Sequence, residues 1–164
     1  KTTTRNFSEM ITFLQTLHNK GKRRPKITYH ETKEGIWNIY QEMNQSKEAL
    51  FISSYEKINR IFPGAIEEWI NLYKRGIIPL KAKHLVANKP FDLDVMRKFS
   101  KISQEVRYLP EIKEFNMDFT IFKNKLAITA LEDEPFIVVI ESESLVNSIR
   151  PIFEIAWVSG KEIE

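Results

Sequence analysis

Hydrophobic and polar residues follow one another along this chain with a period that changes several times. Between residues 6 and 19 (NFSEMITFLQTLHN) the apolar residues Phe7, Met10, Leu14 and Leu17 recur at intervals of 3, 4 and 3. This spacing places all four side chains on one face of a helix. Two heptads are too short to be stable alone. We therefore expect this helix either to pack on the rest of its own chain or to pair with a second copy.

Between residues 26 and 103 the pattern predicts three strands, each followed by helical sequence. Short continuous or alternating apolar runs predict strands, and apolar residues three or four positions apart predict helices. The predicted strands are 26–31, 48–54 and 77–88. The predicted helices are 32–46, 55–76 with a break at Pro63 and Gly64, and 92–103.

Beyond residue 104 the predicted strands follow one another more closely. They are 105–110, 117–132 and 135–142, and a helix over 142–158 closes the chain. The middle segment predicts a hairpin that turns at Lys123 and Asn124. Asn accepts a positive φ more readily than Lys, so the turn type stays open. This order of elements predicts an α/β fold, in which helices flank a mixed sheet.

Composition limits the class of protein. A chain of 164 residues, 42% hydrophobic and 29% charged, fits one globular core. No apolar run approaches the roughly 20 residues that span a bilayer, and the first residues lack a signal peptide's apolar stretch. We therefore expect no membrane association and a cytoplasmic location. The chain has no cysteine and three isolated histidines, so we expect no disulfide, metal or cofactor.

The positive charge is concentrated near the start of the chain. Residues 1–26 carry seven basic side chains and one acidic one, whereas residues 27–164 carry a net charge of −3. The basic cluster includes Gly21 and Pro25, which predict a solvated hinge. We therefore divide the chain into a linker helix with a basic hinge (1–26) and an α/β domain (27–164). Contact of the hinge with nucleic acid, through Lys22, Arg23 and Arg24, is an alternative interpretation.

The usual catalytic motifs are absent. The five glycines form no phosphate-binding loop, dinucleotide fingerprint or nucleophile elbow. Neighbouring acidic residues lie in predicted helix surfaces or turns, where solvated charge is the ordinary interpretation. These acidic groups are Glu67 with Glu68, Asp92 with Asp94, and residues 132–134. His84 lies in a predicted strand, where a lone histidine is more often structural than catalytic.

Several segments, taken in order, resemble one family of proteins. They are RRPKITYHETKEGIWNIYQ, LFISSYE, YKRGI before a strand, VRYLP, DFTIFKNKLAITALEDEPFIVVIES and SLVNSIRPIFEIAW. In order and spacing they resemble the effector domain of TrmB-like transcriptional regulators over roughly residues 1–158. The resemblance implies a phospholipase D-like fold that follows a linker helix and an upstream winged helix-turn-helix domain. It also implies that the linker helix pairs two protomers through Phe7, Met10, Leu14 and Leu17, and that Lys1 follows an unseen DNA-binding domain.

The phospholipase D likeness raises the question of catalysis. Enzymes of that fold use a His-x-Lys-x4-Asp motif that ends near the hairpin turn. A turn set on Lys123 places Asn116 and Asp118 at the histidine and lysine positions, and a turn set on Asn124 places Met117 and Phe119 there. Neither pair supplies the nucleophile of covalent phosphoryl transfer. We therefore expect a catalytically empty fold and no enzymatic activity.

The leading functional hypothesis is an effector and dimerisation domain of a transcription regulator. It forms a homodimer, contacts DNA through the upstream domain, and senses a small molecule near Ser53 and Ser54 at a strand end. One alternative is a divergent phosphodiesterase or nuclease, in which His30 or His84 meets a lysine in space. Another is a nucleic-acid-binding module that uses the basic hinge.

Overall fold

The computed structural model describes residues 2–17 and 24–164, with side chains described at 6–15 and from 24 onward. The helices are α1 (Thr2–Leu17), α2 (Lys33–Asn44), α3 (Tyr55–Ile61), α4 (Ala65–Lys74), α5 (Pro90–Ser100) and α6 (Glu143–Ser159). The strands are β1 (Lys26–His30), β2 (Glu48–Ile52), β3 (Lys81–Ala87), β4 (Glu105–Leu109), β5 (Met117–Phe122), β6 (Lys125–Ala130) and β7 (Phe136–Glu141). The predicted sequence of elements is confirmed, with boundaries shifted by a few residues.

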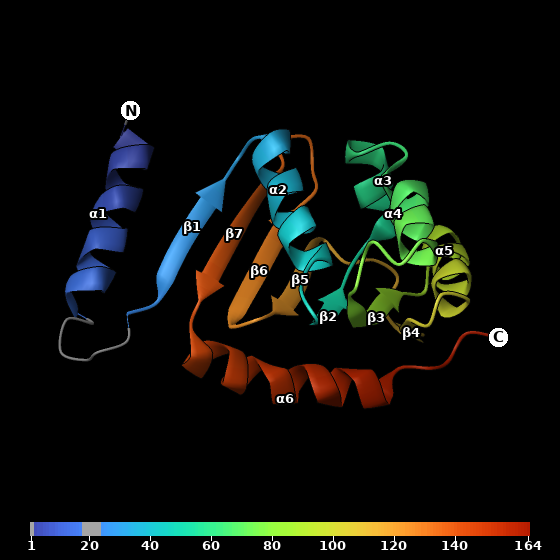
Figure 1. The fold of residues 1–164 in the computed structure, drawn as a ribbon. Helices are drawn as coiled ribbons and strands as arrows, with labels where there is room; N and C mark the ends of the chain where they lie inside the picture. The colour runs from blue at the N-terminus through green and yellow to red at the C-terminus, as the bar shows by residue number, and fades with distance from the viewer. Residues whose placement is uncertain (1, 18–23) are drawn as a thin grey trace.

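The strands form one sheet of seven in the order β1-β7-β6-β5-β2-β3-β4 (Figure 1). Strands β2, β3 and β4 run parallel to one another, and the other pairings are antiparallel. The parallel part comes from the first half of the chain, where helices separate the strands, as crossover connections require. The predicted α/β fold with a mixed sheet is therefore confirmed.

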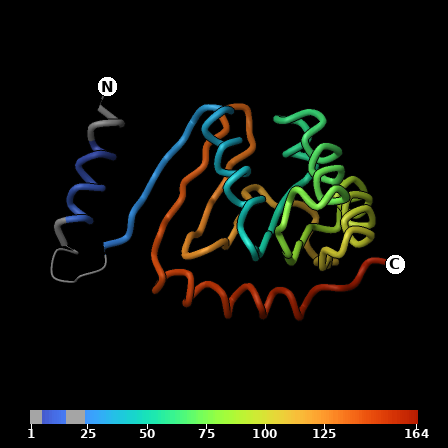
Figure 2. Tube along the Cα trace, in the orientation of Figure 1, coloured from blue at the N-terminus to red at the C-terminus, as the bar shows by residue number. Residues whose placement is uncertain are grey.

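Helices cover the two faces of the sheet unequally. On one face α2, α3, α4 and α5 bury a large core, whose members include Ile36, Trp69 and Phe99. On the other face α6 lies alone beneath the sheet, and its Phe153 and Trp157 pack against the strands (Figures 1 and 2). The single helix leaves part of this second face uncovered.

Local sequence signals account for the ends of the elements. The side chains of Thr32, Ser54 and Ser142 accept backbone N–H groups in the first turns of α2, α3 and α6, as N-cap residues do. Gly76 follows α4 with a φ of +69°, a conformation that glycine adopts without strain. The hairpin turns at the predicted residues, but Lys123, with a φ of +51°, takes the left-handed conformation.

The two ends of the described chain lie at opposite edges of the sheet. Helix α1 lies beside the edge strand β1, where the Phe7 ring is 6.4 Å from the Tyr29 ring (Figure 1). At the other edge, the backbone of Lys161 exchanges hydrogen bonds of 2.8 and 3.0 Å with Tyr108 of β4. Among the helices of residues 2–17 and 24–164, none has the length and apolarity needed to cross a membrane.

The one-sided burial of α6 leads to a stability prediction. Phe153→Ala removes a buried ring from the core beneath the sheet, and we expect the free energy of unfolding to fall by about 3–5 kcal/mol. Ile155, two residues further along, is 70% exposed, and Ile155→Ala is expected to change it by less than about 0.5 kcal/mol. Urea unfolding of both variants measures the contrast. Equal losses would show that the outward face of α6 is also buried.

Candidate functional site

The polar residues of greatest chemical interest lie where β2 and β3 end and β5 begins. Ser53 and Ser54 directly follow β2, and Asp118 lies at the start of β5, next to β2 in the sheet. All three side chains are buried. Buried polar groups need hydrogen-bond partners, so the contacts among these residues define what the site can do.

Two carboxylates bind the first turn of α3. Asp118 Oδ1 accepts the backbone N–H of Ser54 at 3.0 Å, and Asp92 Oδ1 accepts the backbone N–H of Glu56 at 3.0 Å. The first N–H groups of a helix have no partner inside the helix and carry partial positive charge. Asp118 comes from β5 and Asp92 from α5, so this contact ties three distant segments together. The interpretation of Asp92 as solvated charge is wrong, because it is 1% exposed.

Burial controls the protonation of both carboxyl groups. It raises the pKa of Asp118 to about 8, and the Ser54 N–H opposes the rise. Burial likewise raises the pKa of Asp92 to about 6, against the N–H groups of Glu56 and Tyr55. Asp118 Oδ2 has no partner of good geometry. The nearby Ser53 hydroxyl lowers the pKa of Asp118, but only partly offsets the rise that burial causes. Asp118 is therefore mostly protonated at neutral pH and can exchange a proton.

A set of ion pairs lies between the buried Asp118 and the solvent. Lys57, on α3, is 6% exposed, and its Nζ lies 3.1 Å from Glu132 Oε1 and 3.8 Å from Glu114 Oε1. Lys89 joins them through Glu56 and through Glu114, the latter at 3.3 Å. These five ion-paired side chains come from four segments of the chain, so they hold the loops around the site together.

The buried residues of the site form a second set, which includes Lys57 as well. We call Asp118, Asp92, Lys57, Ser53 and Ser54 the carboxyl-end cluster.

The hairpin register decides which residue faces the cluster. Phe122 pairs with Lys125, so Lys123 and Asn124 both lie in the turn, and β5 enters it with Asp118 on the α3 side and Phe119 on the opposite face. In the register that sets the turn on Lys123, Asp118 takes the position that the resemblance assigns to the motif's lysine. Asn116, at the histidine position, is exposed.

The two described histidines lie apart from each other. His84, on the central strand β3, is buried, and its Nδ1 and Nε2 lie 2.5 Å from Tyr55 Oη and 3.2 Å from Gln104 Oε1. Burial lowers the pKa of His84 to about 4, so its ring is neutral at pH 7. His30 lies on the edge strand β1. In the described part of the chain, no group of three or more His, Asp or Glu side chains is arranged to hold a metal ion.

The structure also locates the residues predicted for binding. The side chains of Phe7, Met10 and Leu14 are 47–54% exposed on α1, and that of Leu17 lies outside the described residues. Lys22 and Arg23 also lie outside the described residues, and Arg24 is exposed. Ser54 caps α3, and Ser53 adjoins a cavity of about 20 Å³. Ligand binding by the serines, nucleic-acid contact and dimerisation stay predictions.

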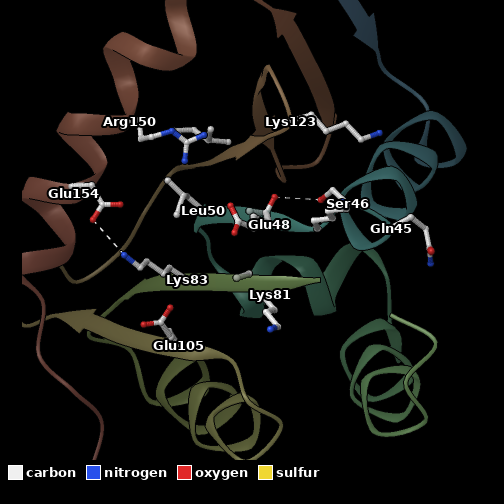
Figure 3. Close-up of a pocket in the computed structure, with 14 residues that line it drawn as sticks. Gln45, Ser46, Glu48, Leu50, Lys81, Lys83, Glu105, Lys123, Arg150 and Glu154 are labelled. Atoms are coloured by element: carbon white, nitrogen blue, oxygen red, sulfur yellow. Dashed lines mark hydrogen bonds and ion pairs between the residues drawn. The ribbon is translucent and has the colours of Figure 1, made fainter. Parts of the chain in front are cut away.

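A larger hollow lies at the opposite end of the strands. This amino-end cleft measures about 960 Å³, and its floor includes Leu50 and Ile121 (Figure 3). Arg150 of α6 points into it, and Lys83 pairs with Glu154 at 3.4 Å across one side (Figure 3). Its other charged lining residues are Lys47, Glu48, Lys81, Glu105 and Lys123. The cleft thus combines a small apolar floor with charges of both signs.

Comparisons with known proteins show the fold. No family model and no curated protein matches this chain. Among solved structures it is similar to TrmBL2, an archaeal chromatin protein whose structure shows a novel mode of DNA binding. That similarity has a TM-score of 0.54 and 16% identity, and covers 99% of this chain and 63% of TrmBL2. The chain thus spans less than two thirds of TrmBL2.

Two further similar structures belong to the phospholipase D fold. One is NUC, a phospholipase D family member from Salmonella typhimurium, with a TM-score of 0.59 and 13% identity over 84% of this chain and 97% of NUC. The other is NucT from Helicobacter pylori, with a TM-score of 0.59 and 9% identity over 84% of this chain and 98% of NucT. The predicted phospholipase D-like fold is confirmed.

The same finding corrects one expectation. The sequence predicted no enzymatic activity, and this prediction is contradicted, because the similar structures include NUC, a phospholipase D family member, and point toward an enzyme. The prediction depended on a single motif. A missing motif removes one nucleophile, but it leaves other acid–base groups, such as Asp118, in place.

The burial of Asp118 makes stability depend on pH. The pKa of about 8 in the folded state lies above the ordinary aspartate pKa of 3.8, so the folded state binds a proton that the unfolded state has lost. The stability that this proton confers is present at low pH and is lost as the pH rises to about 8. Between pH 6 and 8 we expect the free energy of unfolding to fall by up to about 1.4 kcal/mol per pH unit.

The variant Asp118→Asn removes this titration and keeps an oxygen for the Ser54 N–H. We expect its unfolding free energy, measured with urea from pH 5 to 9, to lack that slope. Asp92→Asn is the matched control, because the pKa of Asp92 is about 6 and its slope lies mainly below that pH. A slope between pH 6 and 8 that persists in Asp118→Asn would assign the titration to another group.

Proposed function

We propose that this chain is the effector and dimerisation domain of a DNA-binding regulator similar to the TrmB-like family. The observation that carries the proposal is the extent of the likeness to TrmBL2, which covers 99% of the chain and so includes α1. The likeness to NUC and NucT covers 84% of the chain. The likeness to a DNA-binding protein therefore extends over more of this chain, α1 included, than the likeness to NUC and NucT does.

Dimerisation depends on α1 in this proposal. The helix has 16 residues, and the apolar side chains at 7, 10, 13 and 14 are each about half exposed or more. An isolated helix of this length is marginal in water, and most helical stability comes from packing of an apolar face. A second copy supplies that packing and holds two DNA-binding domains at a fixed separation, as two-fold regulators require.

DNA contact lies outside this chain in the proposal. Residues 27–164 carry a net charge of −3, so they offer little attraction to phosphates. The exposed Arg24 is the first residue of the described range 24–164. The basic hinge as a whole adds at most a salt-sensitive, sequence-independent contribution to the affinity for DNA. Reading of base edges is assigned to a separate domain, as in helix-turn-helix regulators generally.

A small-molecule effector completes the proposal, and the volumes of the two hollows favour one place for it. Pockets for small ligands usually measure about 300–1,000 Å³. The cavity beside Ser53 is far smaller than this, whereas the amino-end cleft falls within the range. Arg150 supports the cleft as the effector site, because its guanidinium points into the hollow (Figure 3) and forms no ion pair with a carboxylate of the described residues.

The dimer is tested by placing a charge in the apolar face of α1. We expect Leu14→Glu to raise the dimer dissociation constant at least tenfold, because a buried carboxylate without a partner is costly. Sedimentation equilibrium over a range of concentrations measures this constant. Ile155→Glu, at an exposed aliphatic position on α6, is the matched control and should leave the constant unchanged. A wild-type chain that is monomeric at all concentrations would contradict the dimer.

Phosphodiester hydrolysis is a second candidate function, favoured by the fold that the chain shares with NUC and NucT. The group best placed for proton transfer is Asp118, with a pKa of about 8 and with Lys57 close enough to lower it. Access to substrate then requires the ion pairs of Lys57 with Glu132 and Glu114 to open.

This candidate predicts turnover of an activated phosphodiester, such as bis(4-nitrophenyl) phosphate, that rises as Asp118 loses its proton near pH 8. We expect Asp118→Asn to lower that turnover at least a hundredfold, in the range usual for loss of a general acid–base group. Ser148→Ala, at an exposed position of α6, controls for contaminating nucleases, since it should change nothing. Equal turnover by wild type and Asp118→Asn would remove Asp118 from the chemistry.

A further inference from the structure

A row of apolar side chains crosses five strands on the side of the sheet that α6 covers in part. Each member is the cross-strand neighbour of the next in the pairing register. The members are Tyr29, Val138, Ile128, Phe119 and Ile52. We call them the apolar row.

Helix α6 covers the apolar row only in part, because Ile52 and Ile128 pack against the α6 core and are half-buried. Its core contacts are with Leu50, Ile121 and Leu126, which lie two residues from row members on β2, β5 and β6 and therefore on the same face. Tyr29 and Phe119 remain 46% and 40% exposed. A band of apolar surface beside a single covering helix has room for a second helix, since helices pack side by side about 8–10 Å apart.

Among the described residues, α1 presents a second exposed apolar surface, and the outward face of α6 presents a third, with Ile152, Ile155 and Val158 62–75% exposed. Phe7, Met10, Phe13 and Leu14 are each about half exposed or more. The Phe7 ring touches the end of the apolar row, 6.4 Å from Tyr29, so the two surfaces are continuous. Neither surface includes a charged side chain, and each therefore fits an uncharged partner.

The two surfaces also agree in length. Five strands at about 4.8 Å spacing make the row about 19 Å long. The 16 residues of α1, at 1.5 Å each, make a helix about 24 Å long. The helix therefore spans the row from β1 to β2.

We propose that α1 of each copy lies across the apolar row of the other copy, in the dimer of the preceding section, on which this inference rests. The chain's own α1 lies beyond the edge of the sheet and leaves its own row exposed (Figure 1). A two-fold exchange covers both rows and both helix faces with one repeated contact.

The area of this exchange fits a stable dimer. Four aromatic side chains take part per copy, and they are 40–60% exposed (Phe7, Phe13, Tyr29 and Phe119). An aromatic side chain buries roughly 150–250 Å² when fully covered, so these four contribute roughly 400 Å². The aliphatic side chains of α1 and of the apolar row add to this buried area, and a standard interface buries about 800 Å² on each partner.

The absence of cysteine from this chain allows a crosslinking test. Met10→Cys and Phe119→Cys are introduced into separate, differently tagged copies, which are mixed and oxidised. We expect a disulfide-linked heterodimer on non-reducing gels. Met10→Cys mixed with Ile155→Cys is the matched control, because Ile155 lies on the outward face of α6, and it should give no such product. Phe119→Lys should also raise the dimer dissociation constant at least tenfold with an unchanged circular dichroism spectrum.

The other outcomes separate this inference from the dimer itself. Disulfides only between two Met10→Cys copies would show that α1 pairs with α1, which overturns the exchange and keeps the dimer. An intramolecular disulfide in the double variant Met10→Cys/Phe119→Cys would show that α1 covers its own row, which also overturns it. A monomer in sedimentation, without any intermolecular disulfide, would refute both.

Discussion

Strand β2 imposes the constraint on which the rest of the molecule depends. It runs parallel to β3 on one side and antiparallel to β5 on the other. Its carboxyl end therefore meets the beginning of β5, and Ser54 lies beside Asp118 although 64 residues separate them along the chain. Open α/β sheets commonly place binding sites where neighbouring strands diverge in this way. The buried carboxylates and the ion pairs around Lys57 follow from this one change of direction.

The carboxyl-end cluster also explains why the fold alone does not decide between the two candidate functions. The N-terminus of a helix attracts anions through its free N–H groups. In this chain α3 offers those groups to Asp118 and Asp92, so the protein's own carboxyl groups satisfy them.

The sequence predicted the elements well because their signals are local. Periodicity, capping serines and the turn at Lys123 depend on residues a few positions apart. The alternation of Asp118 with Thr120 and Phe122 also places a carboxyl group on a buried face, a signal that was available. Burial of Asp92 was not predictable, because its partner, the Glu56 N–H, lies 36 residues away. In the proposed dimer the environment of α1 depends on a second chain, and no single-chain pattern contains it.

The two edges of the sheet end differently. Lys161 hydrogen-bonds to Tyr108, so the chain's own C-terminal segment occupies part of the β4 edge. An unpaired edge strand is a template for pairing with another chain. At the opposite edge, in the described residues, β1 pairs only with β7, and helix α1 lies beside it (Figure 1). Each edge therefore has a segment of its own chain beside it, which shields it in part from strand pairing with another molecule.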